Sequence, residues 1–385
     1  MRILHISYEN VLPDFQTGGQ GVAVWNIARQ QVKAGHEVRV MCPDKQRTGT
    51  VEGVKIVPLV TRMAITGEDV ADRMIAGMEN LGLLWSVTKE FKPDIIHGHE
   101  WSAAEVFMKA KQLEIPLCVT MHLSLFHNLQ YIRKMWDKLC SYHIWWEQEM
   151  CREADGVIAI SDYYEHIIKG RHPKGLVRRI YNGVQPEDFE GETVEIDTDK
   201  IIAFFHGRLV AQKGIALIAE AARRDKNILF VIAGGCSVEP DHAPLAVDID
   251  ELKSNALKDN VLMLGRISQP LIGAYLRKAD VAIYPHYRAP FDLAVLEAMA
   301  CGTPTICTAT DALLEYSTHN VNAYHIPEPP TVENLLKAIY AVAGDSELKK
   351  RISEGGKKKG QEMGWQRAAQ QTVEFYKEII DGYKV

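Results

Sequence analysis

Short apolar runs alternate along the chain with longer stretches in which apolar residues recur every three or four positions. In the first half these runs predict strands at residues 3–7, 37–41, 55–58, 95–98, 117–121 and 156–160. The second half repeats the plan at 201–206, 229–233, 261–264, 281–284 and 305–307. Strands that alternate with helices form parallel sheets covered on both faces. The pattern therefore predicts an α/β protein with two doubly wound, Rossmann-like domains.

Two breaks in this pattern predict the domain boundaries. Residues 186–200, PEDFEGETVEIDTDK, are acidic, rich in turn formers and without a period, which is typical of a linker. We therefore expect an N-terminal domain at 1–185 and a C-terminal domain at 186–364. The last helical stretch, 365–385, follows Gly364 and is interpreted as a separate helix that crosses back to the N-terminal domain. In such two-lobed proteins substrates bind in the cleft between the carboxyl ends of the two sheets.

Composition and charge narrow the classes of function. The 385 residues are 46% hydrophobic and 24% charged, as in ordinary globular proteins, and the net charge of −6 argues against a nucleic-acid binder. Seven cysteines without a C-x-x-C pair predict free thiols in a reducing, cytoplasmic location. The start of the chain lacks the pattern of a signal peptide, and no run approaches the roughly 18 apolar residues of a membrane span. Membrane contact is expected to be peripheral at most.

The stretch 288–303, RAPFDLAVLEAMACGT, leaves a predicted strand and enters a helix. Pro290 lies near the helix entry, and Asp292 can cap it. Free backbone N–H groups and the positive dipole end make such a helix start a seat for phosphate. Glu297, further along, can reach a ribose hydroxyl of a nucleotide held there. The alternative is an ordinary helix with one surface glutamate.

A second candidate loop, GRLVAQKG at 207–214, follows the first strand of the C-terminal domain. Arg208 and Lys213 in this loop can neutralise a diphosphate without a metal. A lone arginine and lysine in a loop are usually solvated surface. The functional interpretation is favoured because this loop and the helix start at 291–293 belong to the same end of one predicted sheet.

The N-terminal domain has a glycine-rich loop at 10–21, NVLPDFQTGGQG, after its first strand. Gly18, Gly19 and Gly21 allow backbone amides to approach an anion closely. An NAD-binding fold would place G-x-G-x-x-G directly after the strand, and only Asp44 favours that interpretation. A plain flexible turn is the third possibility.

Three histidines lie at predicted strand ends. His97 and His99, in HGHEW at 97–101, project from one face of an extended chain, but no third ligand stands at a spacing typical of metal sites. Together with Trp101 they are interpreted as acceptor-side residues or as packing beneath the cleft. His122, just past another strand, can hydrogen-bond a sugar hydroxyl or carry a proton. The alternative is a histidine satisfied within its loop.

Residues 128–150 combine aromatic and basic side chains. An aromatic core, a carbohydrate-stacking surface and an interfacial membrane helix are all compatible with this composition. Acidic residues nearly balance the basic ones, so membrane docking ranks last.

In order and spacing, these motifs resemble those of retaining, nucleotide-sugar-dependent glycosyltransferases of the GT-B fold, in the group 1 class called glycosyltransferase family 4. The resemblance spans the chain and rests on TGGQG, HGHEW, TMH, ADGVIAISD, YNGV, GRLVAQKG and PFDLAVLEAMACGTP. SYEN, HGHEW and GRLVAQKG are also similar to glycogen and starch synthases, which favours a glucosyl-type donor.

The resemblance implies a role for each matching residue. The diphosphate would be held by Gly18, Gly19, Arg208 and Lys213, and the ribose by Glu297. His122 would contact the donor hexose, and the backbone of Phe291, Asp292 and Leu293 would face its hydroxyls. His122, Arg208, Lys213 and Glu297 are the catalytic candidates. No cofactor or metal is implied, because Arg208 and Lys213 supply the charge that a metal supplies in other transferases.

Two positions depart from the family pattern. Ala289 stands where the first acid of the family's E-x7-E motif is expected, and Asp292 stands where the pattern usually has glycine. Asp292 can substitute in part, or the chain is an inactivated variant, or it binds without turnover. Gln16 replaces a lysine that glycogen synthases carry.

The expected reaction is transfer of a hexosyl group from a nucleoside diphosphate sugar to an acceptor hydroxyl, with retention of configuration. The acceptor is expected to be a saccharide or another hydroxyl compound. Two alternatives stay open: a weak or inactive nucleotide-sugar-binding protein, favoured by Ala289, and a nucleotide-sugar 2-epimerase.

Overall fold

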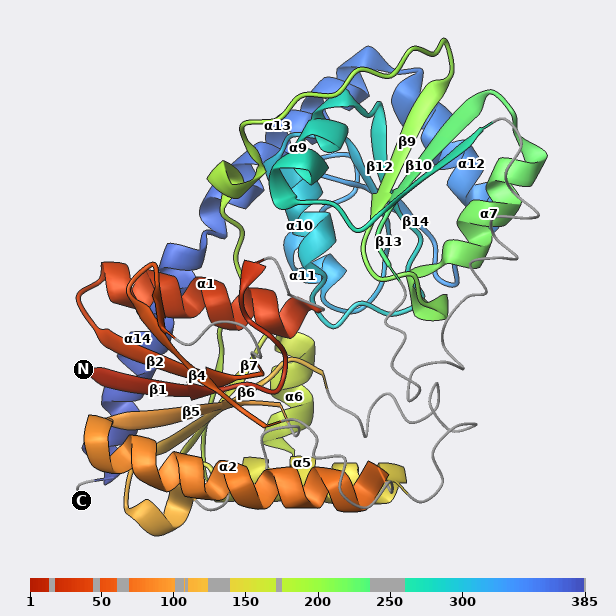
Figure 1. The fold of residues 1–385 in the computed structure, drawn as a ribbon. Coiled ribbons are helices and arrows are strands. Elements are labelled where there is room, and N and C mark those ends of the chain that lie inside the picture. The colour runs from red at the N-terminus through yellow and green to blue at the C-terminus, as the bar shows by residue number, and fades with distance from the viewer. Residues whose placement is uncertain are drawn as a thin grey trace. The chain divides into compact units, whose positions relative to one another are not determined.

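The structure is a computed structural model that describes residues 1–13, 18–43, 49–60, 69–100, 107, 110–123, 139–170, 175–235 and 260–383, with the backbone alone over 69–78 and 139–143 (Figure 1). The chain forms two compact units. The first comprises Met1–Tyr181 and Trp365–Val385, and the second comprises Asn182–Gly364. Each contains its own sheet.

The first unit is built on an eight-stranded sheet in the order β3-β4-β2-β1-β5-β6-β7-β8. Its strands are β1 (Arg2–Ile6), β2 (Glu37–Cys42), β3 (Gly49–Val51), β4 (Val54–Pro58), β5 (Ile95–His99), β6 (Leu117–Met121), β7 (Gly156–Ala159) and β8 (Leu176–Arg179). All neighbours pair in parallel except β3 and β4. Side chains alternate along each strand, so consecutive residues of β1 and of β5 point to opposite faces of the sheet.

Helices cover both faces of this sheet (Figure 1). They are α1 (Gly19–Lys33), α2 (Asp69–Phe91), α5 (Leu139–Glu153), α6 (Asp162–Lys169) and α14 (Trp365–Tyr383), with a short 3-10 turn, η3 (Lys111–Leu113). α1 and α14 lie together on one face, and α2 and α5 lie on the other. An apolar core forms beneath α2, α5 and α6.

The second unit has six parallel strands in the order β11-β10-β9-β12-β13-β14. They are β9 (Ile201–His206), β10 (Ile228–Ala233), β11 (Val261–Gly265), β12 (Val281–Tyr284), β13 (Thr305–Thr308) and β14 (Tyr324–Ile326). Its helices are α7 (Ile215–Arg224), α9 (Gln269–Lys278), α10 (Leu293–Ala300), α11 (Leu313–Tyr316), α12 (Val332–Ala343) and α13 (Ser346–Glu362), with the 3-10 turns η4 (Pro186–Phe189) and η5 (Ala211–Lys213). Figure 1 shows α9, α10 and α13 on one face and α7 and α12 on the other.

The predicted fold, two doubly wound α/β domains, is confirmed. Every predicted strand is present, with ends shifted by at most one residue. The apolar pattern did not indicate β3, β8 and β14, each of which is an edge strand of three or four residues. An edge strand is covered on one side only, so its sequence need not form the apolar run of a central parallel strand. Among the described residues, no helix is long and apolar enough to cross a bilayer.

The C-terminal helix α14 is part of the first unit because its apolar face is buried there. Phe375, Tyr376 and Ile379 are 1%, 0% and 2% exposed. A Cβ on Gly156 of β7 would lie 2.4 Å from Cδ1 of Ile379 and 2.9 Å from Cζ of Phe375. Glycine at this position therefore lets the helix approach the sheet closely.

We predict that Phe375→Ala lowers the free energy of unfolding of the first unit by about 3–5 kcal/mol, because a large buried ring is lost. All seven tryptophans belong to this unit, so tryptophan fluorescence in a urea titration reports its unfolding alone. Glu374→Ala, at an exposed neighbouring position, is the matched control. An unchanged midpoint in Phe375→Ala would show that α14 is not needed for the unit's stability.

Candidate functional site

The candidate loops of the second unit meet where the strand order reverses. β9 is the first strand of its sheet in sequence, and its neighbours β10 and β12 lead in opposite directions across the sheet. In open parallel sheets, ligands bind outside the carboxyl ends of the strands at such a switch point. The loop after β9 carries Arg208 and Lys213, and the loop after β12 leads into α10. The two loops thus lie at one end of one sheet, as expected.

Backbone geometry brings Lys213 against the loop that follows β12. Gly214, the next residue, has a φ of 71°. A side chain there would place its Cβ 2.0 Å from the carbonyl oxygen of Pro285, so only glycine fits. The N–H of Tyr287 donates to the carbonyl oxygen of Gln212 at 2.9 Å. The two loops are therefore joined directly beside the lysine.

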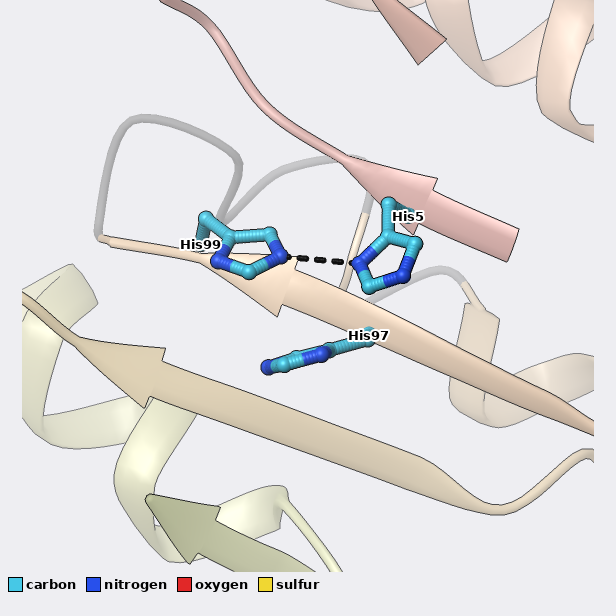
Figure 2. A group of neighbouring side chains, drawn as sticks. All are labelled: His5, His97 and His99. Carbon is cyan, nitrogen blue, oxygen red and sulfur yellow. Dashed lines mark hydrogen bonds between the residues drawn. The ribbon is translucent and has the colours of Figure 1, made fainter. Parts of the chain in front are cut away.

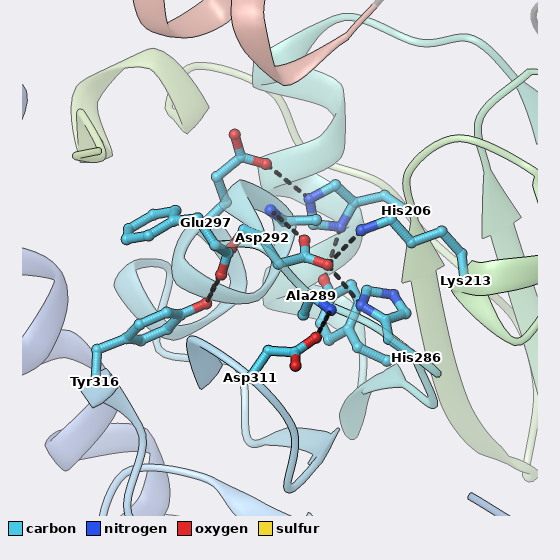
Figure 3. A network of polar contacts seen from close by, with 11 residues as sticks. His206, Lys213, His286, Ala289, Asp292, Glu297, Asp311 and Tyr316 are labelled. Atoms are coloured by element: carbon cyan, nitrogen blue, oxygen red, sulfur yellow. Dashed lines mark hydrogen bonds and ion pairs between the residues drawn. The ribbon is translucent and has the colours of Figure 1, made fainter. Parts of the chain in front are cut away.

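A buried ion pair connects the loops (Figure 3). Nζ of Lys213 lies 2.5 Å from Oδ2 of Asp292, and Nδ1 of His286 lies 2.5 Å from the same oxygen. The three side chains are at most 14% exposed. Oδ1 of Asp292 accepts the N–H of Ala294 at 3.1 Å and caps α10. The prediction that Asp292 caps this helix is confirmed.

These contacts set the charges of the group. Burial acts to raise the pKa of Asp292, but the ammonium of Lys213 and the contact with His286 outweigh it and hold that pKa well below its usual range. Burial, followed by the charge of Lys213, lowers the pKa of His286. At neutral pH the group therefore consists of a carboxylate, an ammonium and a neutral imidazole. Asp292 serves as the counter-ion of Lys213.

The turn that carries Asp292 is held by Tyr316 of α11. Its hydroxyl lies 2.7 Å from the carbonyl oxygen of Phe291 and 3.0 Å from that of Asp292, and can donate to either. Asp292 has φ 73° and ψ 92°, a backbone conformation that residues other than glycine rarely adopt. The ring of Phe291 is 2% exposed and lies 5.2 Å from the ring of Tyr316. The strained turn is thus fixed by one hydroxyl and one ring contact.

Glu297 of α10 ends a second polar chain, which includes the last residues of β9 and β12 (Figure 3). Its Oε2 lies 2.9 Å from Nε2 of His206, and Nδ1 of His206 lies 2.8 Å from the hydroxyl of Tyr284. A carboxylate only accepts, so His206 donates from Nε2 and accepts the Tyr284 hydroxyl at Nδ1. The chain fixes one oxygen of Glu297.

His206, His286 and Tyr316 were not predicted from the sequence as members of the site. A signal existed for two of them, because His206 ends β9 and His286 follows β12 by two residues. The position of Tyr316 depends on the packing of α11 against the turn, which no local pattern reveals.

Ala289, where the family's first motif acid is expected, is fully buried. Its N–H donates to Oδ2 of Asp311 at 2.9 Å, and Oδ1 of Asp311 lies 3.0 Å from the guanidinium of Arg288. The acids beside Ala289 are therefore Asp311, balanced by Arg288, and Asp292, balanced by Lys213. Figure 3 shows both carboxylates on the loops around Ala289.

In the first unit, the described glycines of the loop after β1 lie at the start of α1. Gly18 is its N-cap residue, and Gly19 is its first residue. The N–H of Gly21 donates to Oε2 of Glu9 at 2.8 Å, and a Cβ on Gly18 would lie 2.6 Å from Oε1 of Glu9. The carboxylate of Glu9 thus lies at the helix N-terminus, the kind of position that favours an anion. Asp44 and Gln16 lie outside the described residues.

Three histidines of β1 and β5 cluster in the first unit (Figure 2), and they contact Gln31 of α1 and Tyr376 of α14. One ring nitrogen from each of His5, His97 and His99 lies within 4.8 Å of the others, so three potential metal ligands are present, one more than the sequence pattern indicated. Each ring nitrogen of the three is, however, already within hydrogen-bond distance of a protein group. A metal would have to replace these bonds. The structure places His97 and His99 in the interior, fully buried, and Trp101 lies outside the described residues.

Burial keeps these histidines neutral. It lowers the pKa of His5 to about 4 and that of His122 to about 3. It also holds the pKa values of His97 and His99 well below the ordinary value. The backbone N–H groups of Leu123 and His122 contact the carboxyl group of Glu100, whose pKa burial raises well above its usual range, and these contacts fix the start of the loop after β6.

Two family models match the chain. The model for glycosyltransferase family 4 matches residues 17–188, and the model for group 1 glycosyl transferases matches residues 187–359. The chain belongs to this glycosyltransferase family. The first match covers β2 to β8 of the first sheet, with His97 and His99, and the second covers the whole sheet that carries the Lys213–Asp292 pair.

Individual relatives agree with this family. Glycogen synthase of Mycobacterium tuberculosis is 24% identical over 403 residues, which cover 98% of this chain and 94% of the relative. Sucrose-phosphate synthase from Thermosynechococcus elongatus has a TM-score of 0.85 at 20% identity, with 99% of both chains covered. Anabaena HepE in complex with UDP-glucose has a TM-score of 0.74 at 16% identity, with 98% of this chain and all of that chain covered. The fold of this glycosyltransferase is therefore GT-B, as the sequence predicted.

Two further candidates of the glycosyltransferase are Arg208 and the aromatic segment 128–150. Arg208 lies two residues after the end of β9 and is partly exposed, and its guanidinium makes no hydrogen bond or ion pair within the described part of the chain. Of the segment 128–150, residues 128–138 lie outside the described residues. Within α5, Trp146 packs against the core while Trp145 is 49% exposed. The aromatic-core interpretation therefore holds for Trp146.

We predict that the first unit of the glycosyltransferase loses stability as the pH falls from 6.5 towards 4. The unfolded chain binds protons at histidines with a pKa near 6.5, whereas the folded His5 and His122 do so only near pH 4 and 3. Their contribution is complete above pH 6.5 and declines by about 1.4 kcal/mol per histidine for each unit below it. Urea titrations followed by tryptophan fluorescence measure the slope.

In these titrations His5→Gln should reduce the slope by about 1.4 kcal/mol per pH unit, while His166→Gln, at an exposed position, should not. A wild-type protein equally stable at pH 7 and pH 5 would contradict the burial of these histidines.

Proposed function

We propose that the chain transfers a hexosyl group from a nucleoside diphosphate sugar to an acceptor hydroxyl, with retention of configuration. The observation that carries the proposal is the convergence of Arg208, Lys213, the capped start of α10 and Glu297 at one switch point. Cationic side chains and a helix N-terminus are the groups that stabilise a leaving diphosphate. Family membership and the GT-B fold support the same reaction class.

Lys213 is poised for a diphosphate because its present partner is replaceable. Asp292 balances the ammonium at 2.5 Å in the structure. A diphosphate carries more negative charge than Asp292 and can replace it as the partner of Lys213, while Arg208 supplies the second cation. On this proposal the two cations do the work of a metal ion, and no cofactor is required. Negative charge that develops on the leaving group is then stabilised without reorganising the loops.

Glu297 is proposed to bind the ribose hydroxyls of the donor. One of its oxygens is fixed by His206, and the side chain is 14% exposed. A carboxylate held in this way accepts hydrogen bonds from a diol with little loss of entropy. Gly18 and Gly19 are proposed to approach the diphosphate, in competition with Glu9.

We propose that retention proceeds without a covalent glycosyl intermediate. Asp292 and Asp311 are the carboxylates beside Ala289. Asp311 is neutralised by Arg288 at 3.0 Å, and Asp292 is buried, with one oxygen capping α10 and the other in contact with His286. Neither is available as the nucleophile of a double displacement. The leaving phosphate is then the base that accepts the acceptor proton.

A glucosyl donor is favoured among hexosyl donors. Glycogen and sucrose phosphate, which appear in the names of the relatives, both contain glucose, and HepE was solved with UDP-glucose. The acceptor is proposed to be a saccharide or a similar hydroxyl compound.

We predict that Arg208→Ala and Lys213→Ala each cost about 2–4 kcal/mol of transition-state stabilisation, since each removes a charge facing the leaving group. In steady-state assays kcat/KM should fall about 30- to 1,000-fold. Lys278→Ala removes a surface lysine whose ion pair is with Glu195 and should leave kcat/KM unchanged. Normal turnover in both test variants would exclude this site assignment.

Ala289 supports the alternative of a weak or inactive nucleotide-sugar-binding protein. The main proposal predicts that Ala289→Glu raises transfer by less than about tenfold, because a new carboxylate enters a buried site beside Asp292 and Asp311. A steep rise in the rate of transfer would show instead that the missing acid limits activity.

A donor incubated without acceptor separates transfer from epimerisation. The proposal predicts an unchanged donor sugar in this experiment. An epimerised sugar would identify a 2-epimerase.

A further inference from the structure

A chain of hydrogen bonds runs through the interior of the first unit to His122. Oε1 of Gln31 lies 2.8 Å from Nε2 of His5, and Nδ1 of His5 lies 3.0 Å from Nε2 of His99 (Figure 2). Nδ1 of His99 lies 3.1 Å from Nε2 of His122. Gln31, His5 and His99 are fully buried, whereas His122 is 9% exposed. The chain thus starts in the interior and ends at the member that reaches the surface.

Such a chain has a direction. A neutral imidazole has one N–H donor and one acceptor nitrogen, so a histidine that donates to one neighbour must accept from the other. The low pKa values of the three histidines keep them neutral at physiological pH. The orientation of the Gln31 amide therefore decides which nitrogen carries the proton in every ring along the chain.

A second branch supports one orientation of that amide. Nε2 of Gln31 lies 3.5 Å from the hydroxyl of Tyr376, which lies 2.5 Å from Nδ1 of His97. Nε2 of His97 lies 2.7 Å from the hydroxyl of Thr120. With its N–H group towards Tyr376, Gln31 turns its oxygen towards His5. Tyr376 can then donate to His97, and His97 can donate to Thr120, so every contact in both branches joins a donor to an acceptor.

We infer that Gln31 sets the tautomer of His122 through His5 and His99, so that Nδ1 of His122 is a hydrogen-bond acceptor for a sugar hydroxyl of the substrate. His5, His99 and His122 then carry their protons on Nε2, each donating towards the interior. Gln31, His5 and His99 are positioning residues, and His122 is the residue that meets the substrate. The substrate part of this inference rests on the proposed transfer function.

The arrangement gives the site a preference. A nitrogen that can only accept a hydrogen bond favours a substrate with a hydroxyl group at this position, because the hydroxyl donates to it. A substrate without that hydroxyl leaves a buried lone pair without a hydrogen-bond donor. With the amide reversed, the proton of His122 would lie on Nδ1, and the nitrogen would lose its lone pair for that hydroxyl.

The tautomers are measured directly by long-range proton–nitrogen correlation spectra of the full chain labelled with ¹⁵N-histidine. Signals are assigned by their loss in His5→Gln, His99→Gln and His122→Gln. We expect the proton on Nε2 in all three rings. A proton on Nδ1 of His122 overturns the inference, as does a zinc-dependent change of the His5 and His99 signals when zinc chloride is added at equimolar concentration.

Substitutions at Gln31 test the control of the tautomer. Gln31→Met removes the acceptor, so His122 should show both tautomers. Gln31→Glu keeps an acceptor oxygen next to His5, so it should restore the Nε2 tautomer. Thr372→Val, which removes a buried hydrogen bond of α14 to Ala368, is the control for loss of a buried polar group and should leave His122 unchanged. An unchanged His122 tautomer in Gln31→Met overturns the inference.

The kinetic counterpart uses UDP-glucose, ADP-glucose and their monodeoxy analogues as donors. At one hydroxyl position, the wild type should have a higher kcat/KM for the parent donor than for its deoxy analogue. In Gln31→Met this ratio of kcat/KM values should fall about tenfold, and in Gln31→Glu it should recover in part. Equal preference in wild type and Gln31→Met overturns the link to the substrate. The spectra do not depend on turnover, so failure of the proposed transfer function would appear as absent activity with the tautomers still as expected.

Discussion

The buried contact between Lys213 and Asp292 is the constraint on which the second unit's site depends. A lysine or an aspartate alone in this interior would carry a large desolvation cost, so each requires the other. Their contact demands that two loops approach within hydrogen-bond distance, which only Gly214 allows beside Pro285. It also demands the strained turn at Asp292, which the Tyr316 hydroxyl holds. A pair of this kind contributes little net stability. On the proposed function, it holds a cation where an anionic ligand can bind.

Both units place their polar groups by the same topological rule. In the second sheet the site lies beside β9 and β12, where the strand order reverses. In the first sheet the order reverses at β1 and β5, and these strands carry His5, His97 and His99. At such a switch point, the loops that follow the two central strands lead to opposite faces of the sheet, which leaves room for polar groups at the carboxyl ends of the strands. An apolar core of the first unit forms on the opposite face, under α2, α5 and α6, and the α1–α14 face carries the hydrogen-bonded network.

The sequence predicted the features that depend on local pattern. Apolar runs located the central strands because both of their faces are buried, and Asp292 was predicted as the cap because it stands directly before a run of helix formers. Edge strands such as β8, LVRR, lack that double burial and were missed. The family pattern located Asp292 and Glu297, but the histidines that contact them were not predicted. His286, which contacts Asp292, follows β12, and His206, which contacts Glu297, ends β9.

Contacts between distant elements were beyond local pattern. In the sequence, Gln31 is an ordinary polar position of a predicted helix. It becomes the partner of His5 only because α1 packs over β1. The sequence also indicated two histidines for the strand-end cluster, where the structure assembles more, because β1 and β5 are neighbours in the sheet. The departure at Ala289 was visible in sequence, whereas its burial beside Asp311 was not.

Calorimetric titration of UDP, ADP and GDP tests the central claim most directly, namely that Lys213 receives the donor diphosphate in exchange for Asp292. The account predicts that at least one of the three binds the wild type. Lys213→Met should weaken that binding by about tenfold or more, and Asp292→Asn should strengthen it, because a competing anion is removed. Binding that is absent for all three nucleotides, or equal in the wild type and Lys213→Met, would contradict it.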